Sequence, residues 1–165
     1  MKIAGHIHDS IVDGPGLRFV VFAQGCDKDC EGCHNPEARI AGGGFDKAAD
    51  DIIREMLSNP LTDGLTLSGG EPFLQAGECV KLATAAKSNG LGVWVFTGYT
   101  FEELMKRAKT DRETGELMEL AEVLIDGPFI LAQRSLELKW RGSRNQRVIN
   151  LPKSLFIGEA VEVES

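Results

Sequence analysis

No stretch of the 165-residue sequence reaches the roughly 18 consecutive apolar residues that a membrane-spanning helix needs. Residues 1–16 also lack the apolar segment of a secretory signal, so we expect a cytoplasmic protein whose thiols are reduced. Positive charge is scarce: 18 lysines and arginines face 25 aspartates and glutamates, and the net charge of -7 argues against non-specific nucleic-acid binding. With 42% hydrophobic and 26% charged residues, the composition excludes collagen, a coiled coil and a disordered chain.

Cysteine is scarce as well, and three of the four cysteines stand together. Cys26, Cys30 and Cys33 fall within eight residues. In a reducing compartment, clustered cysteines bind metals or act in catalysis more often than they form disulfides. The fourth, Cys79, follows 46 residues after Cys33 in an expected helix, where we expect it to face the core.

The arrangement of the three thiols favours an iron–sulfur cluster over zinc. Structural zinc takes four ligands, usually as two separated pairs, and no second Cys/His pair follows here. His34 adjoins Cys33, and neighbouring residues rarely close on one tetrahedral ion. A cluster held by three thiolates keeps one iron open, where a substrate or cofactor can bind. A zinc site remains the alternative.

Apolar, β-rich runs alternate with helical patterns along the chain. Strands are expected at 17–23, 65–68, 93–96 and 123–125. Helices are expected at 46–59, at 75–88, after the capping box of Thr100 and Glu103, and after a polar turn at 111–115. Beyond residue 129 the pattern weakens: 136–140 and 147–150 are each compatible with a strand, and 158–165 with an edge strand or a loose end.

This alternation predicts an α/β fold with parallel βαβ units. A complete eight-fold barrel needs about 250 residues, and this chain supplies five or six strands. We therefore expect an incomplete, laterally open parallel (βα) barrel, or a small open sheet, in a single domain over 1–165. Its core is expected at about 13–151, followed by a C-terminal tail at 152–165. In either form the site lies at the carboxyl ends of the strands.

Each expected strand ends in a loop of chemically useful residues. In a parallel sheet these loops meet on one face, so agreement between them carries more weight than any one motif. In chain order they are the cysteine loop, Gly69-Gly70-Glu71-Pro72, Thr97-Gly98-Tyr99 and Asp126-Gly127-Pro128.

The spacing Cys26-x3-Cys30-x2-Cys33, followed by His34-Asn35-Pro36 and then by Gly69-Gly70-Glu71-Pro72, resembles the radical S-adenosylmethionine (SAM) superfamily. The segments 13–18, 126–129 and 140–147 further resemble its small glycyl-radical activases that serve anaerobic ribonucleotide reductase. The resemblance covers about 1–151. In many superfamily members the residue before the third cysteine is aromatic, whereas here it is Gly32, a mark of the reductase-activating group.

The resemblance implies a set of cofactor-binding residues. Cys26, Cys30 and Cys33 would hold three irons of a 4Fe-4S cluster, and SAM would bind the fourth iron. The Gly69-Gly70 backbone would approach the methionine amino group, because glycine has no Cβ. The further positions implied for SAM are Gly32, Cys33, His34, Glu71 and Asp126.

Simpler roles stay open for some of these residues. Glu71 also fits an acid in the first turn of a helix, His34 a loop histidine packed beside the cluster, and Asp126 a turn-forming aspartate. The segment 141–147 is either a solvated basic loop or a contact with SAM or a partner, and Trp140 beside its arginines favours an interface. The histidines at 6 and 8 precede the first expected strand and are assigned no role.

The resemblance also implies a reaction. SAM is cleaved reductively to methionine and a 5′-deoxyadenosyl radical, which takes a hydrogen atom from a glycine of anaerobic ribonucleotide reductase. No catalytic residue beyond the cluster and SAM is implied. The implied electron donor is a flavodoxin or ferredoxin, and neither a membrane nor a nucleic acid is an implied partner. The alternatives are an activase of a pyruvate formate-lyase-type enzyme, which is usually longer, a radical SAM enzyme with a small-molecule substrate, and a non-catalytic zinc or electron-transfer module.

Overall fold

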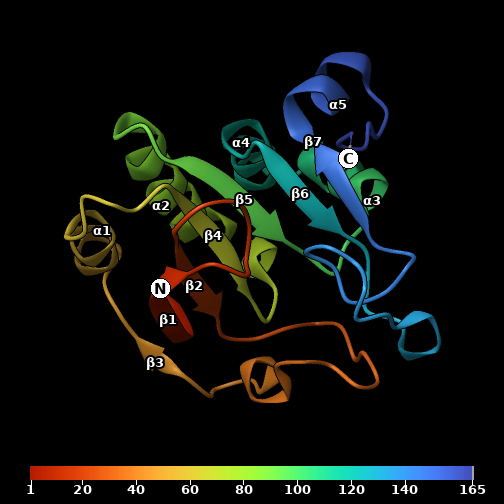
Figure 1. The fold of residues 1–165 in the computed structure, drawn as a ribbon, viewed down its shortest axis with the longest axis horizontal. Coiled ribbons are helices and arrows are strands. Elements are labelled where there is room, and N and C mark those ends of the chain that lie inside the picture. Colours follow the sequence, from red (N-terminus) through yellow and green to blue (C-terminus); the bar gives the residue numbers. More distant parts are fainter. Residues whose placement is uncertain (165) are drawn as a thin grey trace.

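The computed structural model describes residues 1–164, and in that part of the chain it contains one seven-stranded sheet (Figure 1). The strand order across the sheet is β3-β1-β2-β4-β5-β6-β7. The strands are β1 (Lys2–Ser10), β2 (Arg18–Ala23), β3 (Phe45–Asp46), β4 (Gly64–Gly69), β5 (Gly92–Phe96), β6 (Val123–Asp126) and β7 (Arg147–Asn150).

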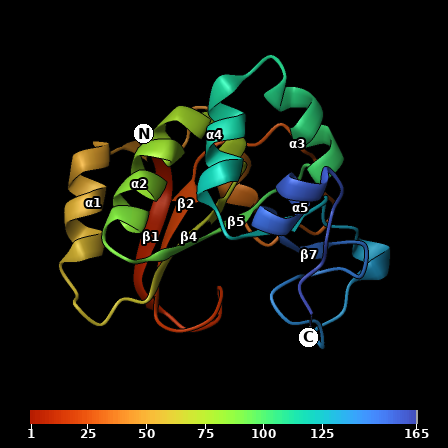
Figure 2. The same ribbon diagram turned by 90° about the horizontal axis from the view of Figure 1, so that it is seen from above.

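Four central strands, β2, β4, β5 and β6, run parallel to one another. Their order follows the chain in one direction, and crossovers between parallel strands are almost always right-handed, so the connecting helices fall on the same face of the sheet. Figure 2 shows α1, α2 and α4 together on that side. The helices are α1 (Ala49–Leu57), α2 (Ala76–Ser88), α3 (Phe101–Ala108), α4 (Arg112–Leu120) and α5 (Leu151–Ile157).

The expected parallel barrel of five to six strands is corrected to an open sheet with antiparallel borders. β1 returns antiparallel to β2, and β7 runs antiparallel to β6. Residues 11–17 connect β1 to β2 and the longer segment 127–146 connects β6 to β7, and neither antiparallel pair needs a crossover helix. The expected strands at 17–23, 65–68, 93–96 and 123–125 are confirmed as β2, β4, β5 and β6.

The chain beyond β6 differs from the sequence expectation in two places. The segment 136–140 is not a strand but an exposed loop, in which Leu136 is 84% exposed. Residues 147–150 do form a strand, β7, but the expected tail begins with the helix α5. The side chain of Asn150 caps α5 by accepting a hydrogen bond from the backbone N–H of Lys153, and Gly158 ends it with a φ of 87°. Glu162 then forms an isolated bridge to Ile149.

The core lies between the sheet and the helices on its covered face. Alternate residues of the central strands point into it, including Phe19, Val21, Leu65, Leu67 and Val95, all at most 1% exposed. The helices contribute Ile52, Met56, Cys79, Leu82, Leu104, Leu117 and Met118.

The intervening strand residues point to the opposite face, which none of these helices covers. Phe22, Ser68 and Phe96 stand next in sequence to core residues, and they line cavities on this face. Among residues 1–164 no helix has the length and hydropathy to cross a membrane.

Candidate functional site

The four loops at the carboxyl ends of β2, β4, β5 and β6 meet around one cavity of about 170 Å³. This convergence was predicted from the sequence and is confirmed. The lining residues include Cys26, Cys30 and Cys33 from the first loop, Gly69 and Gly70 from the second, Thr97 and Gly98 from the third, and Gly127 and Phe129 from the fourth.

The three cysteines are half-buried, unpaired thiols in a loop held by its own backbone. The N–H of Cys33 donates to the carbonyl of Cys30 at 3.2 Å, and the Arg39 guanidinium donates to the same carbonyl at 3.0 Å. The N–H of Lys28 donates to the Cys26 sulfur at 3.4 Å, a contact that favours a thiolate. Burial raises the pKa of the Cys26 thiol, so a metal bound by this sulfur must displace its proton.

The three sulfurs are spread more widely than a single zinc ion requires. Zinc–sulfur bonds of about 2.3 Å in a tetrahedron would bring the sulfurs to roughly 3.8 Å from one another. Among residues 1–164 the three Sγ atoms do not form a group within 4.8 Å of one another. The fourth cysteine, Cys79, is fully buried in α2, as predicted, with its Sγ 3.5 Å from the carbonyl of Pro72. The donor set is therefore three thiols around a shared cavity.

The Gly69-Gly70 pair lets the loop after β4 pack directly on the cysteine loop. A Cβ on Gly69, whose φ is 103°, would lie 2.5 Å from the backbone N of Ala23. A Cβ on Gly70 would lie 2.2 Å from the carbonyl oxygen of Gly25. Backbone hydrogen bonds of 2.8 Å join the N–H of Gly70 to Ala23 and the N–H of Glu71 to Gly25. The glycines thus allow a close approach of two backbones, and they also line the cavity.

Glu71 joins the second loop to the third. Its fully buried carboxylate accepts hydrogen bonds from the Thr97 hydroxyl and the Gly98 N–H, both at 2.8 Å, and from the Phe73 N–H at 2.9 Å. Burial raises the pKa of Glu71 to about 7, although these donors favour the charged form. Glu71 itself does not line the cavity, whereas Thr97 and Gly98 do. The buried carboxylate therefore acts on the cavity by fixing the position of these two residues.

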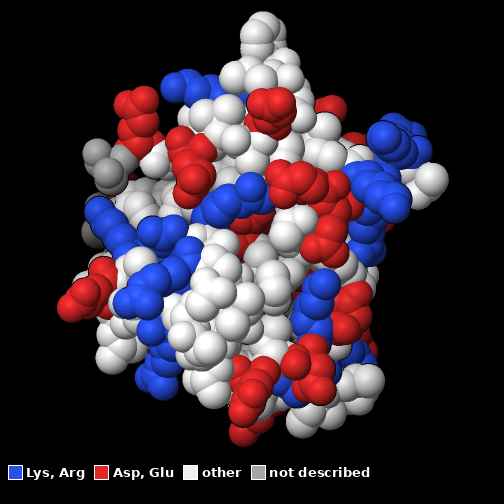
Figure 3. Space-filling model, turned by 90° about the vertical axis from the view of Figure 1, so that its right-hand side faces the viewer, with Lys and Arg blue, Asp and Glu red and all other residues white. Residues whose placement is uncertain are grey.

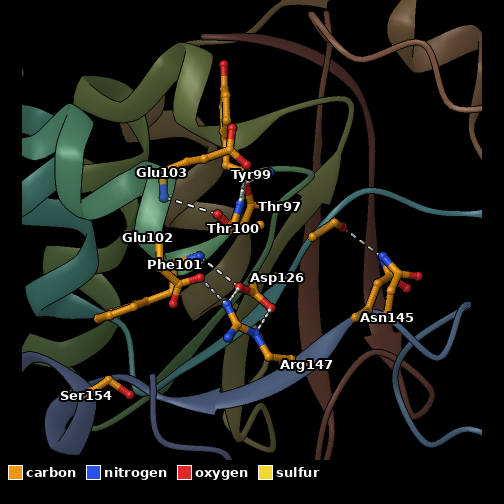
Figure 4. A network of polar contacts seen from close by, with 12 residues as sticks. Thr97, Tyr99, Thr100, Phe101, Glu102, Glu103, Asp126, Asn145, Arg147 and Ser154 are labelled. Atoms are coloured by element: carbon orange, nitrogen blue, oxygen red, sulfur yellow. Dashed lines mark hydrogen bonds and ion pairs between the residues drawn. The ribbon is translucent and has the colours of Figure 1, made fainter. Parts of the chain in front are cut away.

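Asp126 serves the fourth loop in a similar way (Figure 4). Its carboxylate is 1% exposed and accepts hydrogen bonds from the Arg147 guanidinium at 2.6 and 3.1 Å, and from the Phe101 N–H at 2.7 Å. The latter contact places the carboxylate at the N-terminus of α3, where a negative charge is favoured. Its neighbours Ile125 and Gly127 line the cavity, whereas the Asp126 side chain points away from it toward Arg147.

The segment 140–147 folds back over the fourth loop. The Gln146 amide donates to the carbonyl of Gly127 at 3.1 Å, and Asn145 donates to the carbonyl of Pro128 at 2.7 Å. Gln146 lines the cavity; the sequence offered its segment, 141–147, as a possible contact with SAM or a partner, but did not single out this residue. The sequence signal for Gln146 was weak, because a glutamine between arginines has the pattern of a solvent-exposed loop.

His34 and Gly32 lie where the cysteine loop faces the fourth loop. The His34 ring packs edge-on against Phe129 at 5.1 Å between centroids, and it lines the cavity. Gly32 is exposed with a φ of 76°, and a Cβ there would come within 3.0 Å of Leu131. A side chain at position 32 would therefore press on the segment that carries Phe129.

A second cavity of about 400 Å³ adjoins the first and shares six lining residues with it. It extends over the uncovered sheet face between Val12 and Asp13 on one side and Leu136 and Leu138 on the other. The shared residues are His34, Asn35, Ser68, Phe96, Phe129 and Gln146. The second cavity therefore continues the cysteine-lined cavity along this face.

The fold and the thiol-lined cavity together define an iron–sulfur protein. Residues 12–149 match the model of the 4Fe-4S single cluster domain, and the chain therefore belongs to that family. The chain is 34% identical over 146 residues to the anaerobic ribonucleoside-triphosphate reductase-activating protein of Haemophilus influenzae, covering 82% of this chain and 89% of the relative. It is 34% identical over 149 residues to the protein of that name from Escherichia coli K12, covering 86% and 93%.

A pyruvate formate-lyase-activating enzyme of Listeria monocytogenes is also similar. It is 36% identical over 99 residues, which are 54% of this chain and 40% of the relative. The resemblance to glycyl-radical activases that the motifs indicated is thus confirmed, and it extends over most of the chain for the relatives of the reductase-activating kind.

Proposed function

We propose that this protein is a radical SAM activase that generates the glycyl radical of an anaerobic ribonucleotide reductase. The observation that carries the proposal is the cavity in which three thiols of one loop face glycine-rich loops from three neighbouring strands. Activating proteins of such reductases align with most of the chain, which supports the choice of partner. The proposed cofactors are a 4Fe-4S cluster and SAM, and the proposed place of action is the cytoplasm.

In this proposal Cys26, Cys30 and Cys33 hold three irons of the cluster and leave the fourth iron to SAM. When bound, these two cofactors together supply a carbon-centred radical by one-electron reductive cleavage of the sulfonium. The protein's own contribution is positioning. Gly69 and Gly70 bring the second loop against the cysteine loop with no side chain in between, which leaves cavity space for the methionine part of SAM.

The proposed adenosine contacts come from the wall that faces Gly32 and His34. Phe129 offers an aromatic surface, and the Gln146 amide stands beside Gly127. Glu71 and Asp126, which were expected as direct SAM contacts, act in this proposal as positioning residues for Gly98 and Gly127. In this proposal the walls of the two adjoining cavities shield the reacting atoms from solvent. A partner protein approaches along the sheet face that no helix covers.

The surface supports a protein partner. Figure 3 shows lysines and arginines interspersed with aspartates and glutamates around an uncharged area, on the side of the molecule at the right of Figure 1. On that face no charge of one sign dominates, which suits a protein better than a nucleic acid. The proposed electron donor is a small flavodoxin or ferredoxin.

The test is an anaerobic reconstitution with iron and sulfide, followed by reduction, addition of SAM and measurement of 5′-deoxyadenosine. Wild-type protein is expected to yield the nucleoside, and Cys30→Ala is expected to reduce the yield at least a hundredfold. Cys79→Ala is the matched control, because this thiol lies in the core and should leave cluster content unchanged. Uptake of one zinc ion with SAM left intact would overturn the proposal.

The partner is tested separately by electron paramagnetic resonance. Reduced, SAM-loaded protein is mixed with an anaerobic ribonucleotide reductase, or with a pyruvate formate-lyase-type enzyme. The glycyl-radical signal is expected with the reductase. A signal with the lyase alone would support the second candidate, which the partial match to a lyase-activating enzyme favours.

A further inference from the structure

A second cluster of metal-ligand side chains lies outside the cofactor cavity. His6 and His8 stand two residues apart on β1, so their rings point to the same face of the sheet. Glu55 on α1 reaches the same place. Its Oε2 lies 3.0 Å from Nε2 of His6 and 3.5 Å from Nε2 of His8. One ligand atom from each residue fits within a group 4.8 Å across.

Two polar atoms of this cluster are buried without a hydrogen-bond partner: Nδ1 of His6 and Oε2 of Glu55. The carboxylate oxygen faces both imidazole nitrogens, yet neither contact has hydrogen-bond geometry. A cation bound by Oε2 of Glu55 between the two Nε2 atoms would therefore give this buried oxygen the partner it lacks.

The rings are held in place by packing. Phe19 of β2 stacks on His6 with 5.7 Å between ring centroids, and it meets His8 edge-on at 5.3 Å. Fixed ligands lose little conformational entropy when an ion binds, which favours binding.

We propose that His6, His8 and Glu55 form a binding site for a divalent transition-metal ion of the zinc type. Two imidazoles and one carboxylate are a ligand set that suits Zn²⁺, Co²⁺, Ni²⁺ or Cu²⁺, and a fourth position is left for water. The site would join β1 to α1. It lies on the helix-covered face of the sheet, and none of its residues lines the cysteine cavity, so it is independent of the proposed function.

Lys47 provides the counter-charge when no metal is bound. Its Nζ donates to Oε1 of Glu55 and lies 3.2 Å from Nε2 of His6. A metal ion and an ammonium group repel each other at this distance, so metal binding displaces Lys47 toward solvent. Removal of this ammonium should therefore strengthen metal binding, whereas a purely structural ion-pair cluster would only be weakened.

The experiment is a titration of the full chain with Zn²⁺ alone, in which isothermal calorimetry measures binding. Metal analysis after dialysis then gives the number of bound ions. Wild-type protein is expected to bind one equivalent more than His8→Ala does, whatever the cysteine loop takes up. His8 is partly exposed, so this substitution leaves the core intact. Asp51→Asn is the matched control, because it removes an exposed carboxylate of α1 outside the proposed site and should keep that equivalent.

Two further measurements distinguish the site from adventitious binding. Lys47→Met is expected to tighten the binding of this equivalent at least threefold. Co²⁺ bound in this site is expected to give d–d absorption bands that are missing in His8→Ala. These bands differ from those of Co²⁺ bound by the cysteine loop, which include sulfur-to-cobalt charge transfer. Equal stoichiometry in wild type and His8→Ala would overturn the proposal, as would binding that appears only in Lys47→Met.

Discussion

The hydroxyl of Thr97 donates a 2.8 Å hydrogen bond to the carboxylate of Glu71, across 26 residues of sequence and between the loops that follow β4 and β5. The same carboxylate oxygen accepts the Gly98 N–H at 2.8 Å. Because Gly98 lines the cysteine cavity and Glu71 does not, the buried carboxylate acts on the site through the third loop. Its protonation state is therefore coupled to the shape of the cavity.

Glu71 should give the protein a measurable pH dependence of stability. Its folded pKa of about 7 exceeds the ordinary value of 4.5, so between these values the folded state binds more protons than the unfolded state. The free energy of unfolding contributed by Glu71 therefore falls as pH rises from about 4.5 to about 7, by up to about 3 kcal/mol. Urea unfolding at several pH values measures this slope.

Glu71→Gln should remove this slope. It should also lower the free energy of unfolding at pH 5 by about 1–3 kcal/mol, because the amide group points donors at the N–H groups of Phe73 or Gly98. Glu116→Gln is the control: it removes a carboxylate from α4 whose ion pair is with the exposed Arg112. An unchanged slope in Glu71→Gln would show that other groups cause the pH dependence.

Gly70→Ala should destabilise the protein and reduce cluster content. Its Cβ would lie 2.2 Å from the carbonyl oxygen of Gly25, a backbone atom that cannot move aside without shifting the start of the cysteine loop. We expect a loss of about 2 kcal/mol or more in urea unfolding. Gly5→Ala is the matched control, since its Cβ meets no atom within 4 Å, and its effect should be under about 1 kcal/mol. Wild-type stability in Gly70→Ala would refute the close-packing role.

Asp126→Asn should uncouple the fourth loop from β7. The substitution removes the negative charge that pairs with Arg147 and leaves the buried Phe101 N–H facing an amide. We expect the free energy of unfolding to fall by about 2–3 kcal/mol. In the cluster-loaded protein we expect weaker binding of SAM, because Gly127 loses its fixed position. Glu102→Gln is the control, because this exposed carboxylate contacts the same guanidinium and contributes under about 1 kcal/mol.

The parallel part of the fold could be predicted because its strands are buried on the helix-covered face and, at Val20, Thr66 and Trp94, on the face without helices as well. Such strands form continuous apolar runs, as at 17–23 and 65–68, and these runs survive without any partner information. β1 was missed because only Ile3 and Ser10 are fully buried in it, so neither alternation nor an apolar run is visible. Strand direction at the borders also has no periodic signature, which is why the sequence could not decide between an incomplete barrel and a small open sheet.

The location of the site was predictable, whereas the orientation of its side chains was not. The loops at the carboxyl ends of parallel strands lie at the same edge of the sheet. The position of the cavity could therefore be predicted from the order of the motifs along the chain. Glu71 and Asp126 point to Thr97 and Arg147, which lie more than 20 residues away in sequence and carry no linked signal. The Gly69-Gly70 pair predicted that another group packs closely against this backbone. Only the fold shows that one such group is the backbone of the cysteine loop.

Arg18→Met should destabilise the protein at the end of the sheet opposite the cysteine loop. The guanidinium is 3% exposed and donates to the Thr66 hydroxyl at 3.0 Å and to the carbonyls of Leu65 and Gly92 at 2.8 and 3.0 Å. Methionine fills much of the volume but leaves these acceptors without their donors, so we expect a loss of about 3 kcal/mol in urea unfolding.

The control for Arg18 is Arg54→Met, since Arg54 forms only an exposed pair with Asp51 on α1 and should contribute under about 1 kcal/mol. Because Arg18 contacts no residue of the cysteine loop, the iron content of reconstituted Arg18→Met should equal that of wild type at temperatures where both are folded. A loss of iron at full folding would instead mean that the anchoring of β2 at Arg18 is transmitted along the strand to Cys26.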